Sequence, residues 1–325
     1  MTRPQSVRTA VTLAGALLAT TVFAGAALPG AQAATDSLPQ GQSRTVSMQD
    51  LCGDCKPEKW VQCGKFLEGP AFDDKGNLWM VSIESGNIEK VTPDGKCTTA
   101  TKTGGEPQGL KFHNGKLYGV DRKRGVFTID PATGKVEDYM RYFNNENFHG
   151  PNDLIIDQEG GIYFTDPWGS SVLNPTGGVY YVSKDKKIYR LADHLHFPNG
   201  IALSPDDKTL YIGDFNAQRV IAVPVLSPGM IDVGFAHVAA HLSGGWGTDG
   251  MAVDDKGDVY IAHYMGGEIV VLDPDGFIVG TIPLPQGAGK QTTNVAFHQG
   301  YMYITEAGKN EVWRVKMNVE GAKLY

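Results

Sequence analysis

Apolar residues in this chain recur in short alternating runs, each bounded by glycine, asparagine or aspartate, from about residue 61 to residue 317. Alternation with a period of two is typical of strands that bury one face, and Asp/Gly clusters between such runs are typical of hairpin turns. Stretches with helical periodicity are few. The pattern therefore predicts a protein built almost entirely from short antiparallel strands.

Six segments share one pattern: a polar residue, a short apolar run, an Asp/Gly turn and an aromatic-rich strand. Their leading residues are Glu68, Gln108, Asn152, Asn199, Asp249 and Thr293, at steps of 40, 44, 47, 50 and 44 residues. A period in the forties with about four strands per unit is the signature of a propeller blade, and six units in phase argue against a sandwich with accidental periodicity. We therefore expect an all-β fold, a six-bladed β-propeller with four antiparallel strands per blade, over residues 61–318, followed by a tail at 319–325.

The first 33 residues have the pattern of a signal peptide. Arg3 and Arg8 precede an apolar, Ala-rich stretch over Val11–Leu28, and residues 31–33 form a small-x-small cleavage site. A transmembrane anchor is the alternative, but Gly and Thr interrupt the stretch and a Pro-Gly pair ends it. We therefore expect an exported protein, periplasmic or secreted, with no membrane span in the mature chain.

The net charge of the chain limits the classes of partner that it is expected to bind. The 325 residues carry a formal net charge of −7, and removal of the predicted signal peptide, with two arginines and no acidic residue, lowers it to −9. No basic patch would release counterions from a polyanion, so nucleic acid is not an expected partner. A small molecule is the expected partner instead.

All four cysteines lie in the first third of the chain, and they are Cys52, Cys55, Cys63 and Cys97. An even count in an exported protein favours disulfides, and four cysteines allow three pairings. A redox or zinc half-site at the C-x-x-C pair is less favoured, because no βαβ pattern surrounds it and no second such pair follows. We expect residues 34–60 to pack as an arm along the outside, with two bridges tying this arm to the first blade.

The six leading residues should converge, because the innermost strand of each propeller blade lines the central channel. All six offer oxygen, and Glu68 and Asp249 are carboxylates. Hard cations such as Ca²⁺ take about six to eight oxygen ligands, and two carboxylates balance one divalent charge. A channel mouth that is simply wet is the alternative reading of these residues. We expect one divalent cation here, with Ca²⁺ preferred and Mg²⁺, Mn²⁺ or Zn²⁺ as alternatives, although the lack of Cys and His disfavours zinc.

The six leading residues together are called the ring. Four short motifs contain four of these ring residues. They read Glu68-Gly-Pro, Gly150-Pro151-Asn152-Asp153, Pro198-Asn199-Gly200 and Thr248-Asp249-Gly250-Met251. In this order they resemble the motifs of the gluconolactonase, or regucalcin (senescence marker protein), family of six-bladed propellers, which is akin to paraoxonase and diisopropyl fluorophosphatase. The resemblance covers essentially the whole mature chain and implies a lactonase-like activity.

The resemblance also implies roles for individual residues. The ligands of a divalent metal would be Glu68, Asn152, Asn199 and Asp249. Asp249 would act as the general base or nucleophile. Two features depart from the pattern: Ala252 and Ala296 stand where diisopropyl fluorophosphatase has the ligands of a second, buried calcium, and the arginine that regucalcin supplies near its substrate has no assignable counterpart.

A second set of polar residues follows the second strand of each repeat, and they are Ser82, Asp121, Asp166, Asp214, His263 and Glu306. Most should cap turns, since aspartate after a strand commonly accepts hydrogen bonds from loop backbone. Asp214 and His263 are also candidates for supporting the ring.

Other candidates surround the expected pocket. His149 and His196 lie three residues before the two ring asparagines, and Gln108 and Asn294 could orient substrate or water. An aromatic wall, suited to a mostly apolar pocket, is expected from Phe148, Trp168, Phe197, Trp246 and Tyr264.

Together these features favour a metal-dependent hydrolase that opens a lactone or related ester, with Asp249 as base or nucleophile. The alternatives are an organophosphate or aryl esterase on the same metal site and a non-catalytic, metal-stabilised binding propeller. A strictosidine-synthase-like propeller is disfavoured by the four intact metal positions, and a quinone-dependent dehydrogenase by the lack of a basic cluster.

Overall fold

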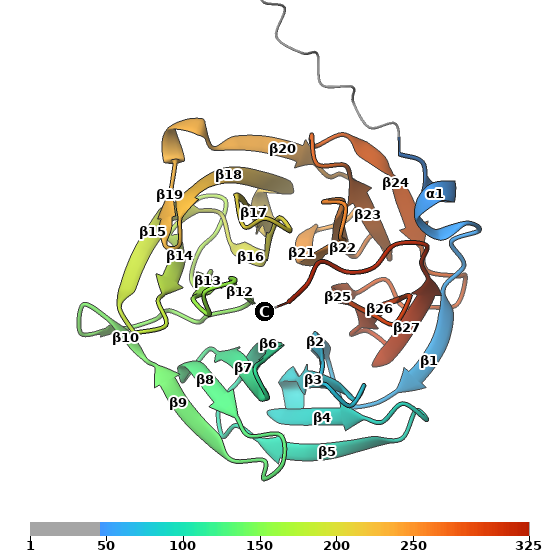
Figure 1. Cartoon of the computed structure of the whole chain (residues 1–325), viewed down its shortest axis with the longest axis horizontal. Coiled ribbons are helices and arrows are strands. Elements are labelled where there is room, and N and C mark those ends of the chain that lie inside the picture. Colours follow the sequence, from blue (N-terminus) through green and yellow to red (C-terminus); the bar gives the residue numbers. More distant parts are fainter. Residues whose placement is uncertain (1–45, 325) are drawn as a thin grey trace, which may run out of the picture. The chain divides into compact units, whose positions relative to one another are not determined.

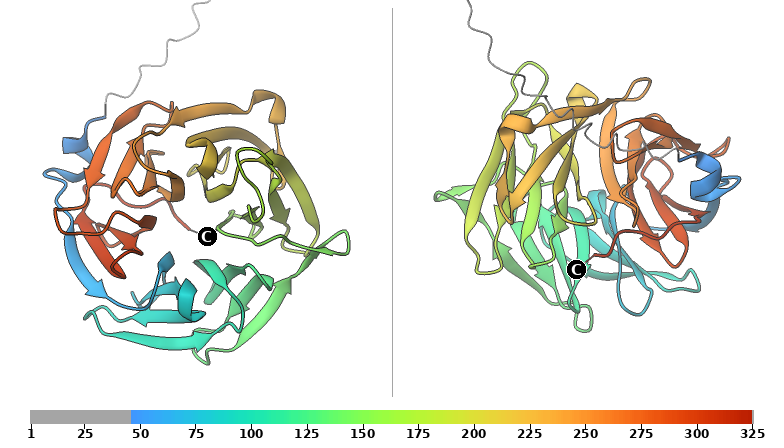
Figure 2. Two further views of the ribbon diagram at one scale, coloured as in Figure 1. Left: turned by 180° about the vertical axis from the view of Figure 1, so that it is seen from behind. Right: turned by 45° about the horizontal axis from the view of Figure 1, so that its top comes forward.

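The structure is a computed structural model that describes residues 46–324. These residues form a ring of six antiparallel blades around a central axis, as the repeat predicted (Figure 1). Figure 2 shows the ring from behind and tilted, with the blades radiating from the axis. The predicted signal peptide lies outside the described residues.

In each of the first five blades the strands follow sequence order, from the innermost strand at the axis to the outermost strand. Blade 1 holds β2 (Leu67–Phe72), β3 (Leu78–Ser82), β4 (Asn87–Val91) and β5 (Cys97–Lys102); blade 2 holds β6 (Pro107–His113), β7 (Lys116–Asp121), β8 (Gly125–Ile129) and β9 (Val136–Met140). Blade 3 holds β12 (Leu154–Ile156), β13 (Ile162–Asp166), β14 (Gly177–Val182) and β15 (Ile188–Leu195). Blade 4 holds β16 (Pro198–Leu203), β17 (Thr209–Asp214), β18 (Arg219–Ser227) and β20 (His237–His241), and blade 5 holds β21 (Gly247–Val253), β22 (Val259–Tyr264), β23 (Glu268–Leu272) and β24 (Ile278–Pro283). Short extra strands are β10 (Tyr142–Phe143) with β11 (Glu146–Asn147), and β19 (Met230–Ile231) beside β18.

The sixth blade joins the two ends of the propeller. Its inner strands are β25 (Thr292–His298), β26 (Tyr301–Glu306) and β27 (Glu311–Lys316), and its outermost strand is β1 (Glu58–Gln62) from the N-terminal arm. Glu58 pairs with Arg314 and Gln62 with Glu311. The arm also carries a short helix, α1 (Met48–Cys52), at the outer rim, where it contacts β24 (Figure 1). The ring is therefore closed by hydrogen bonds between residues far apart in sequence.

Both disulfides expected from the even cysteine count are present, and one of them reaches the first blade. Cys63, which follows β1, bonds to Cys97 at the start of β5, so this bridge ties the closing strand to blade 1. Cys52 bonds instead to Cys55. The expectation that both bridges tie the arm to the first blade was wrong, because Cys55 lies three residues from Cys52 in the turn that ends α1.

Removing the two bridges should have unequal effects on stability. Loop-closure entropy grows with loop length, so the bridge that spans 34 residues should contribute about 3–4 kcal/mol and the one that spans 3 about 2 kcal/mol. We expect the Cys63→Ala/Cys97→Ala variant to unfold at lower denaturant concentration than the Cys52→Ala/Cys55→Ala variant, as measured by equilibrium unfolding. The opposite order would contradict the role of Cys63–Cys97 in holding the closing strand.

The hydrophobic core is divided among the contacts between neighbouring blades. Buried side chains form clusters at each of the six blade–blade boundaries within residues 46–324. At the closing boundary, for example, Leu67 and Met80 of blade 1 pack with Tyr303 and Val312 of blade 6. Leu51 of α1 is fully buried and belongs to the cluster between blades 5 and 6, so the arm contributes to the core. This packing holds the inner strands, and hence the ring residues, at a fixed radius from the axis.

The hairpin turns explain the recurrent Asp-x-x-Gly segments of the sequence. The Oδ1 atom of Asp73 accepts hydrogen bonds from the backbone N–H groups of Lys75 and Asn77, each at 2.9 Å. Asp157 makes the same contacts with the N–H groups of Glu159 and Gly161. Aspartate side chains of this kind stabilise a turn from within, so these two inner hairpins are fixed locally.

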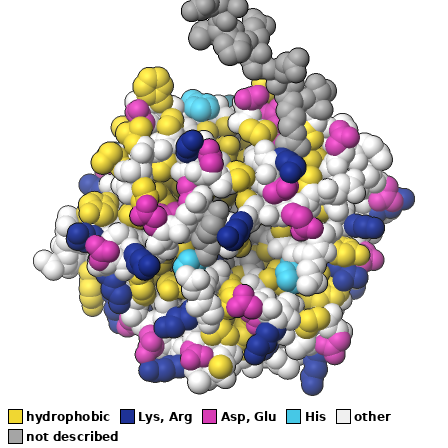
Figure 3. Space-filling view, viewed as in Figure 1, with side chains coloured by type: hydrophobic (Ala, Val, Ile, Leu, Met, Phe, Trp, Pro, Cys, Tyr) yellow, Lys and Arg dark blue, Asp and Glu magenta, His cyan; other side chains and the backbone are white. Residues whose placement is uncertain are grey.

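The surface bears on the partners of the protein. No helix among residues 46–324 is long and apolar enough to cross a membrane. On the face shown in Figure 3, Lys and Arg side chains alternate with Asp and Glu, and no large area of one charge is visible. That face offers no extended basic surface of the kind that a polyanion binds.

Candidate metal centre at one mouth of the channel

The strand register brings the leading residues of the six blades to one mouth of the channel. In five of the six inner hairpins the first residue of the inner strand pairs with the last residue of the next strand: Leu67 with Ser82, Pro107 with Asp121, Pro198 with Asp214, Gly247 with Tyr264 and Thr292 with Glu306. In each of these five hairpins the register shifts after the first or the second pair, at or beside the leading residue. A bulge of this kind re-aims a side chain. The bulges therefore explain how polar residues at the start of buried strands face the axis.

Glycines allow the inner strands to approach closely behind the ring. The residue after the leading residue is glycine in four of the six repeats. A Cβ atom on Gly200 would lie 2.2 Å from the carbonyl oxygen of Asp249, and one on Gly69, where φ is +54°, would lie 2.7 Å from Cα of Gly109. Since neither position can accept a side chain without moving backbone, these glycines set the diameter of the mouth.

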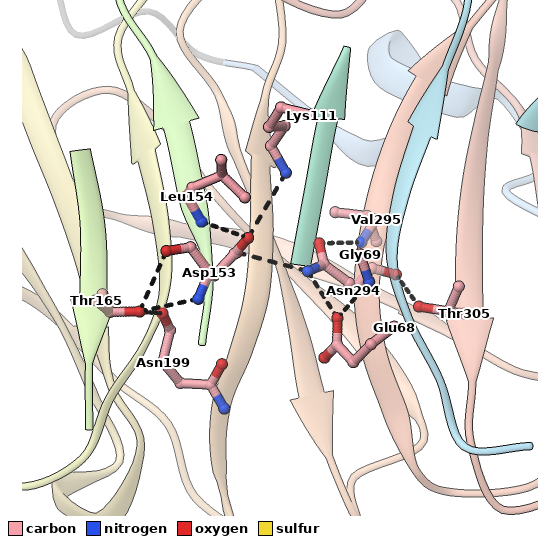
Figure 4. Close-up of polar contacts among 10 residues, drawn as sticks. All are labelled: Glu68, Gly69, Lys111, Asp153, Leu154, Thr165, Asn199, Asn294, Val295 and Thr305. Carbon is pink, nitrogen blue, oxygen red and sulfur yellow. Dashed lines mark hydrogen bonds and ion pairs between the residues drawn. The ribbon is translucent and has the colours of Figure 1, made fainter. Parts of the chain in front are cut away.

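The other two repeats have Asp153 and Asn294 at the position of these glycines, and both side chains are buried. Figure 4 shows them facing each other across the channel. Nδ2 of Asn294 donates a hydrogen bond to Oε2 of Glu68 at 3.0 Å and lies 3.5 Å from Oδ2 of Asp153. Asn294 thus links Glu68 of blade 1 with Asp153 of blade 3.

Three carboxyl groups lie close enough to perturb one another. They are the ring residues Glu68 and Asp249, and Asp153, which directly follows a ring residue. Burial raises the pKa of Glu68 from 4.5 to about 8, and the nearby charge of Asp153 adds to the rise. The pKa of Asp249 is raised well above 3.8, first by burial and then by the charges of Glu68 and Asp153. Carboxyl groups crowded in this way cannot all ionise without a compensating positive charge.

Lys111 provides part of that charge, although the sequence alone did not point to this residue. Its Nζ atom lies 3.7 Å from Oδ1 of Asp153, and both side chains are almost completely buried. Burial raises the pKa of Asp153, and Lys111 opposes this rise. The signal for Asp153 was present in the aligned repeats, where an acidic residue stands at a position that is usually glycine. Lys111 gave no such signal, because it lies within an ordinary strand pattern.

The remaining ring residues show how a cation would be accommodated. Oδ1 of Asn199 is buried and accepts no hydrogen bond from any residue of the described range. A buried acceptor without a partner costs about 1–3 kcal/mol, so an added positive charge here would be favourable. The amide group of Asn199 also opposes the rise in the pKa of Asp249, and Asn152 is half-buried in the preceding blade. Oxygen donors of this kind, with two buried carboxylates, fit a hard divalent cation.

Hydroxyl groups hold the backbone of the ring in place. Oγ1 of Thr165 donates to the carbonyl oxygen of Asn199 at 2.7 Å, which links blade 3 to blade 4 (Figure 4). Oγ1 of Thr293 donates to the carbonyl oxygen of Leu67 at 2.7 Å, which links blade 6 to blade 1. The ring residue Thr293 therefore contacts backbone, and Gln108 likewise donates to the carbonyl oxygen of Glu106 at 3.2 Å.

The candidates that follow the second strands mostly contact their own loops. Asp166 accepts hydrogen bonds from the N–H groups of His149 and Gly150, at 2.9 and 2.6 Å, and so positions the segment that leads to Asn152. Three others likewise bond to backbone N–H groups of nearby loops: Ser82, Asp121 and Glu306.

Asp214 and the histidines have other partners. Asp214 is fully buried, forms an ion pair with Arg219 at 2.8 Å and contacts His196 at 3.4 Å. Nδ1 of His263 lies 3.1 Å from Glu268, while its Nε2 atom is buried with no partner among the described residues. The side chain of His149 is exposed.

Aromatic residues gather at the same mouth, with one correction to the expected wall. Phe148 is buried between blades 2 and 3, where its ring contacts those of Phe164 and Tyr180. It was wrongly placed in the wall, because the chain turns toward the core before it reaches His149. Phe215, at the end of β17, lies next to Phe197 and Tyr264 instead.

The opposite mouth of the channel has a different character. A cavity of about 440 Å³ opens there, lined by the far ends of the inner strands and by residues 320–324 of the C-terminal tail. The tail is held by hydrogen bonds such as that from the N–H of Ala322 to the carbonyl oxygen of Val253 at 2.8 Å. The C-terminal end lies near the axis in Figure 1. The six leading residues do not border this cavity.

Comparison with known proteins places the chain in a family. Residues 66–308 match the model of the SMP-30/Gluconolactonase/LRE-like region. The lactonase drp35 of Staphylococcus saprophyticus is 33% identical over 259 residues, which are 75% of this chain and 79% of that protein. The chain therefore belongs to the SMP-30/gluconolactonase/LRE-like family, and the resemblance carried by the four motifs is confirmed.

Solved structures agree on the fold. A gluconolactonase from Xanthomonas campestris superposes with a TM-score of 0.73 at 24% identity, covering 83% of this chain and 91% of that one. A calcium-binding protein, regucalcin, from Agrobacterium tumefaciens gives a TM-score of 0.68 at 22% identity, covering 82% and 97%. The lactonase relatives support a hydrolase that acts on lactone esters and imply a small-molecule substrate.

Proposed function

We propose that this protein is a hydrolase that opens a lactone with the help of one divalent cation, preferably Ca²⁺, held at the ring mouth of the channel. The observation that carries the proposal is the contact between two buried carboxylates, Glu68 and Asp249, beside the unpartnered amide oxygen of Asn199. Buried carboxylates without a compensating cation would destabilise the folded protein, and oxygen atoms of this kind are the ligands that hard divalent cations bind.

The proposed ligands have two roles: the carboxylates supply negative charge, and the asparagines supply neutral oxygen atoms. Glu68 and Asp249 supply the two negative charges that balance a divalent cation, and Asn152 and Asn199 supply neutral oxygen. Asn294 holds Glu68 through its 3.0 Å hydrogen bond, and the Thr165 hydroxyl fixes the backbone of Asn199. The regucalcin of similar fold is described as calcium-binding, which supports Ca²⁺ over other cations.

A bound divalent cation supplies Lewis-acid stabilisation of the negative charge that develops on the carbonyl oxygen of a lactone. Asp249 accepts the proton of the attacking water at a carboxylate oxygen and returns it to the alkoxide oxygen that is released when the ring C–O bond of the lactone breaks, which gives a hydroxy acid. The amide of Asn294 donates to Glu68 and lies 3.5 Å from Asp153, so it engages both of these carboxyl groups. Direct attack by the Asp249 carboxylate is the alternative course of the same reaction.

A panel of substrates tests this proposal. The purified mature protein would be loaded with Ca²⁺ and assayed against γ- and δ-lactones, linear aryl esters and an organophosphate triester, with Mn²⁺ and Zn²⁺ in parallel. We expect lactones to be hydrolysed with kcat/KM at least tenfold above the linear esters and the triester. Faster hydrolysis of the triester would identify a phosphotriesterase, and tight Ca²⁺ binding without any turnover would identify a binding propeller.

A further inference from the structure

The channel of the propeller has a distinct layer of side chains, three residues beyond the ring residue on each inner strand. Four of the six side chains are the single methyl groups of alanine, which leave the channel open at this level. The layer consists of Ala71, Lys111, Ile155, Ala202, Ala252 and Ala296, and all six border the cavity of about 440 Å³ at the far mouth. Among these six residues, Lys111 alone carries a charge.

The walls of this cavity are largely apolar. The residue that follows each member of the layer is apolar in all six repeats, for example Phe72, Phe112 and Phe297, and each of these residues borders the cavity. The C-terminal tail borders it as well, held by the hydrogen bond from the N–H of Ala322 to the carbonyl oxygen of Val253 at 2.8 Å. Cavities of this size, with apolar walls and few polar groups, are typical of sites that bind small organic molecules.

Lys111 brings a buried ammonium group to this cavity. Its side chain is only 7% exposed, and its ion pair with Oδ1 of Asp153, at 3.7 Å, is longer than a hydrogen bond. Nζ of Lys111 donates no hydrogen bond to any residue between 46 and 324. An ammonium group has three N–H donors, and burying it without hydrogen bonds is costly. An additional acceptor at Nζ would therefore stabilise the folded protein.

The cavity reaches Lys111 from the side away from the proposed metal centre. Figure 4 shows Lys111 and Asn199 on opposite sides of Asp153. Asp153 does not border the cavity, and its Oδ1 atom already accepts a hydrogen bond from the N–H of Leu154 at 2.8 Å. The N–H groups of Lys111 are therefore available to an acceptor inside the cavity.

The charges around the cavity limit the kind of ligand. The layer offers no side-chain oxygen to a cation, and the charge of Lys111 repels one. Hairpin turns and the tail add five charged residues to the border, of which four are acidic: Asp73, Asp74, Asp207, Glu320 and Lys323. These acidic groups disfavour a ligand with several negative charges. A single negative charge on an otherwise apolar molecule meets both conditions.

We propose that this cavity binds a monocarboxylate with an apolar chain, such as a fatty acid of about eight carbons, a size that suits a small-molecule cavity. The carboxylate accepts hydrogen bonds from Nζ of Lys111, and the chain packs against the apolar walls. The site is independent of lactone hydrolysis, because it lies at the opposite mouth of the channel and none of the ring residues borders it.

Isothermal titration calorimetry of the full protein with octanoate, 1-octanol and acetate tests the proposal. Octanoate has both the charge and the chain, whereas 1-octanol lacks the charge and acetate lacks the chain. We expect octanoate to bind at one site per chain, with a dissociation constant at least tenfold below those of the other two. The titrations are made with Ca²⁺ and again after chelation, and the affinity for octanoate should change less than threefold.

Two substitutions locate the site. Lys111→Met keeps the length of the side chain and removes its charge, so the affinity for octanoate should fall at least tenfold while that for 1-octanol changes less than threefold. Ala296→Phe fills the cavity and should weaken the binding of both ligands at least tenfold. Lys116→Met is the matched control, because Lys116 is exposed at the start of β7 and does not border the cavity.

Circular dichroism checks that each variant is folded, and Ala296→Phe tests the site by itself if Lys111→Met does not fold. Equal affinities for octanoate and 1-octanol, or octanoate binding that both substitutions leave unchanged, would overturn the proposal. Octanoate binding that is lost on chelation would place the ligand at the metal centre instead. The absence of saturable octanoate binding would equally refute the site.

Discussion

Replacing Asp249 by asparagine is expected to lower kcat/KM for lactone hydrolysis by about 10²–10⁴-fold, the range that a general base contributes. The protein should remain folded, because asparagine has nearly the same shape and removes a carboxyl whose pKa is already raised by burial and by Glu68. In the metal-free state the variant should be at least as stable as the parent, since a source of repulsion is lost. Steady-state kinetics and thermal unfolding followed by circular dichroism measure both effects.

Asp255→Asn is the matched control for this substitution. Asp255 belongs to the same blade, lies in the turn after β21 and forms a 2.8 Å ion pair with Lys256. This control should leave kcat/KM within twofold of the parent. A fully active Asp249→Asn protein would remove Asp249 from the reaction and leave it, at most, a structural role.

Removing divalent cations with a chelator is expected to abolish lactone hydrolysis and to lower the Tm. A cation present at 100 times its dissociation constant stabilises the folded state by about 2.7 kcal/mol, and for a domain of this size that corresponds to a shift of roughly 5–10 °C. Readdition of Ca²⁺ should restore both quantities. Glu68→Gln should weaken Ca²⁺ binding, since one of the two proposed charged ligands is lost.

The loss of stability should also depend on pH. In the metal-free protein the pKa of Glu68 is about 8 in the folded state against 4.5 ordinarily, so the folded state binds more protons than the unfolded state between these values. The free energy of unfolding should therefore fall as the pH rises from about 4.5 through 8, and Ca²⁺ should remove most of this fall. Metal-free protein that loses no stability over that range, and activity that survives chelation, would contradict a metal centre at Glu68 and Asp249.

The sequence was informative about the fold because each blade repeats the same local chemistry. Aspartate turns such as the one at Asp73, and leading polar residues at steps of 40–50, could be recognised without knowledge of distant contacts. The contribution of β1 to the sixth blade could not be recognised in this way, since its partner strand lies more than 240 residues away and its own pattern is not distinctive.

The site was predicted less completely than the fold, for a similar reason. Residues at equivalent positions of the repeats, such as Glu68 and Asp249, could be placed at a common mouth from the period alone. The ion pair between Lys111 and Asp153 joins positions that are not equivalent in neighbouring blades, so the repeat period does not predict their contact. The misplacement of Phe148 has the same origin, because side-chain direction near a loop depends on packing between blades.

The position of β1 in the sixth blade sets the order in which the molecule can be completed. Glu58 is among the first residues of the propeller to be synthesised, but its partner Arg314 is among the last. Until that late segment emerges, β1 has no partner strand and the apolar surface of blade 1 that faces blade 6 has no cover. Contacts of such long sequence separation form slowly because of the entropy of closing the chain. The nascent protein therefore passes through an open, five-bladed arc whose ends expose strand edges, and premature release in that state would favour aggregation.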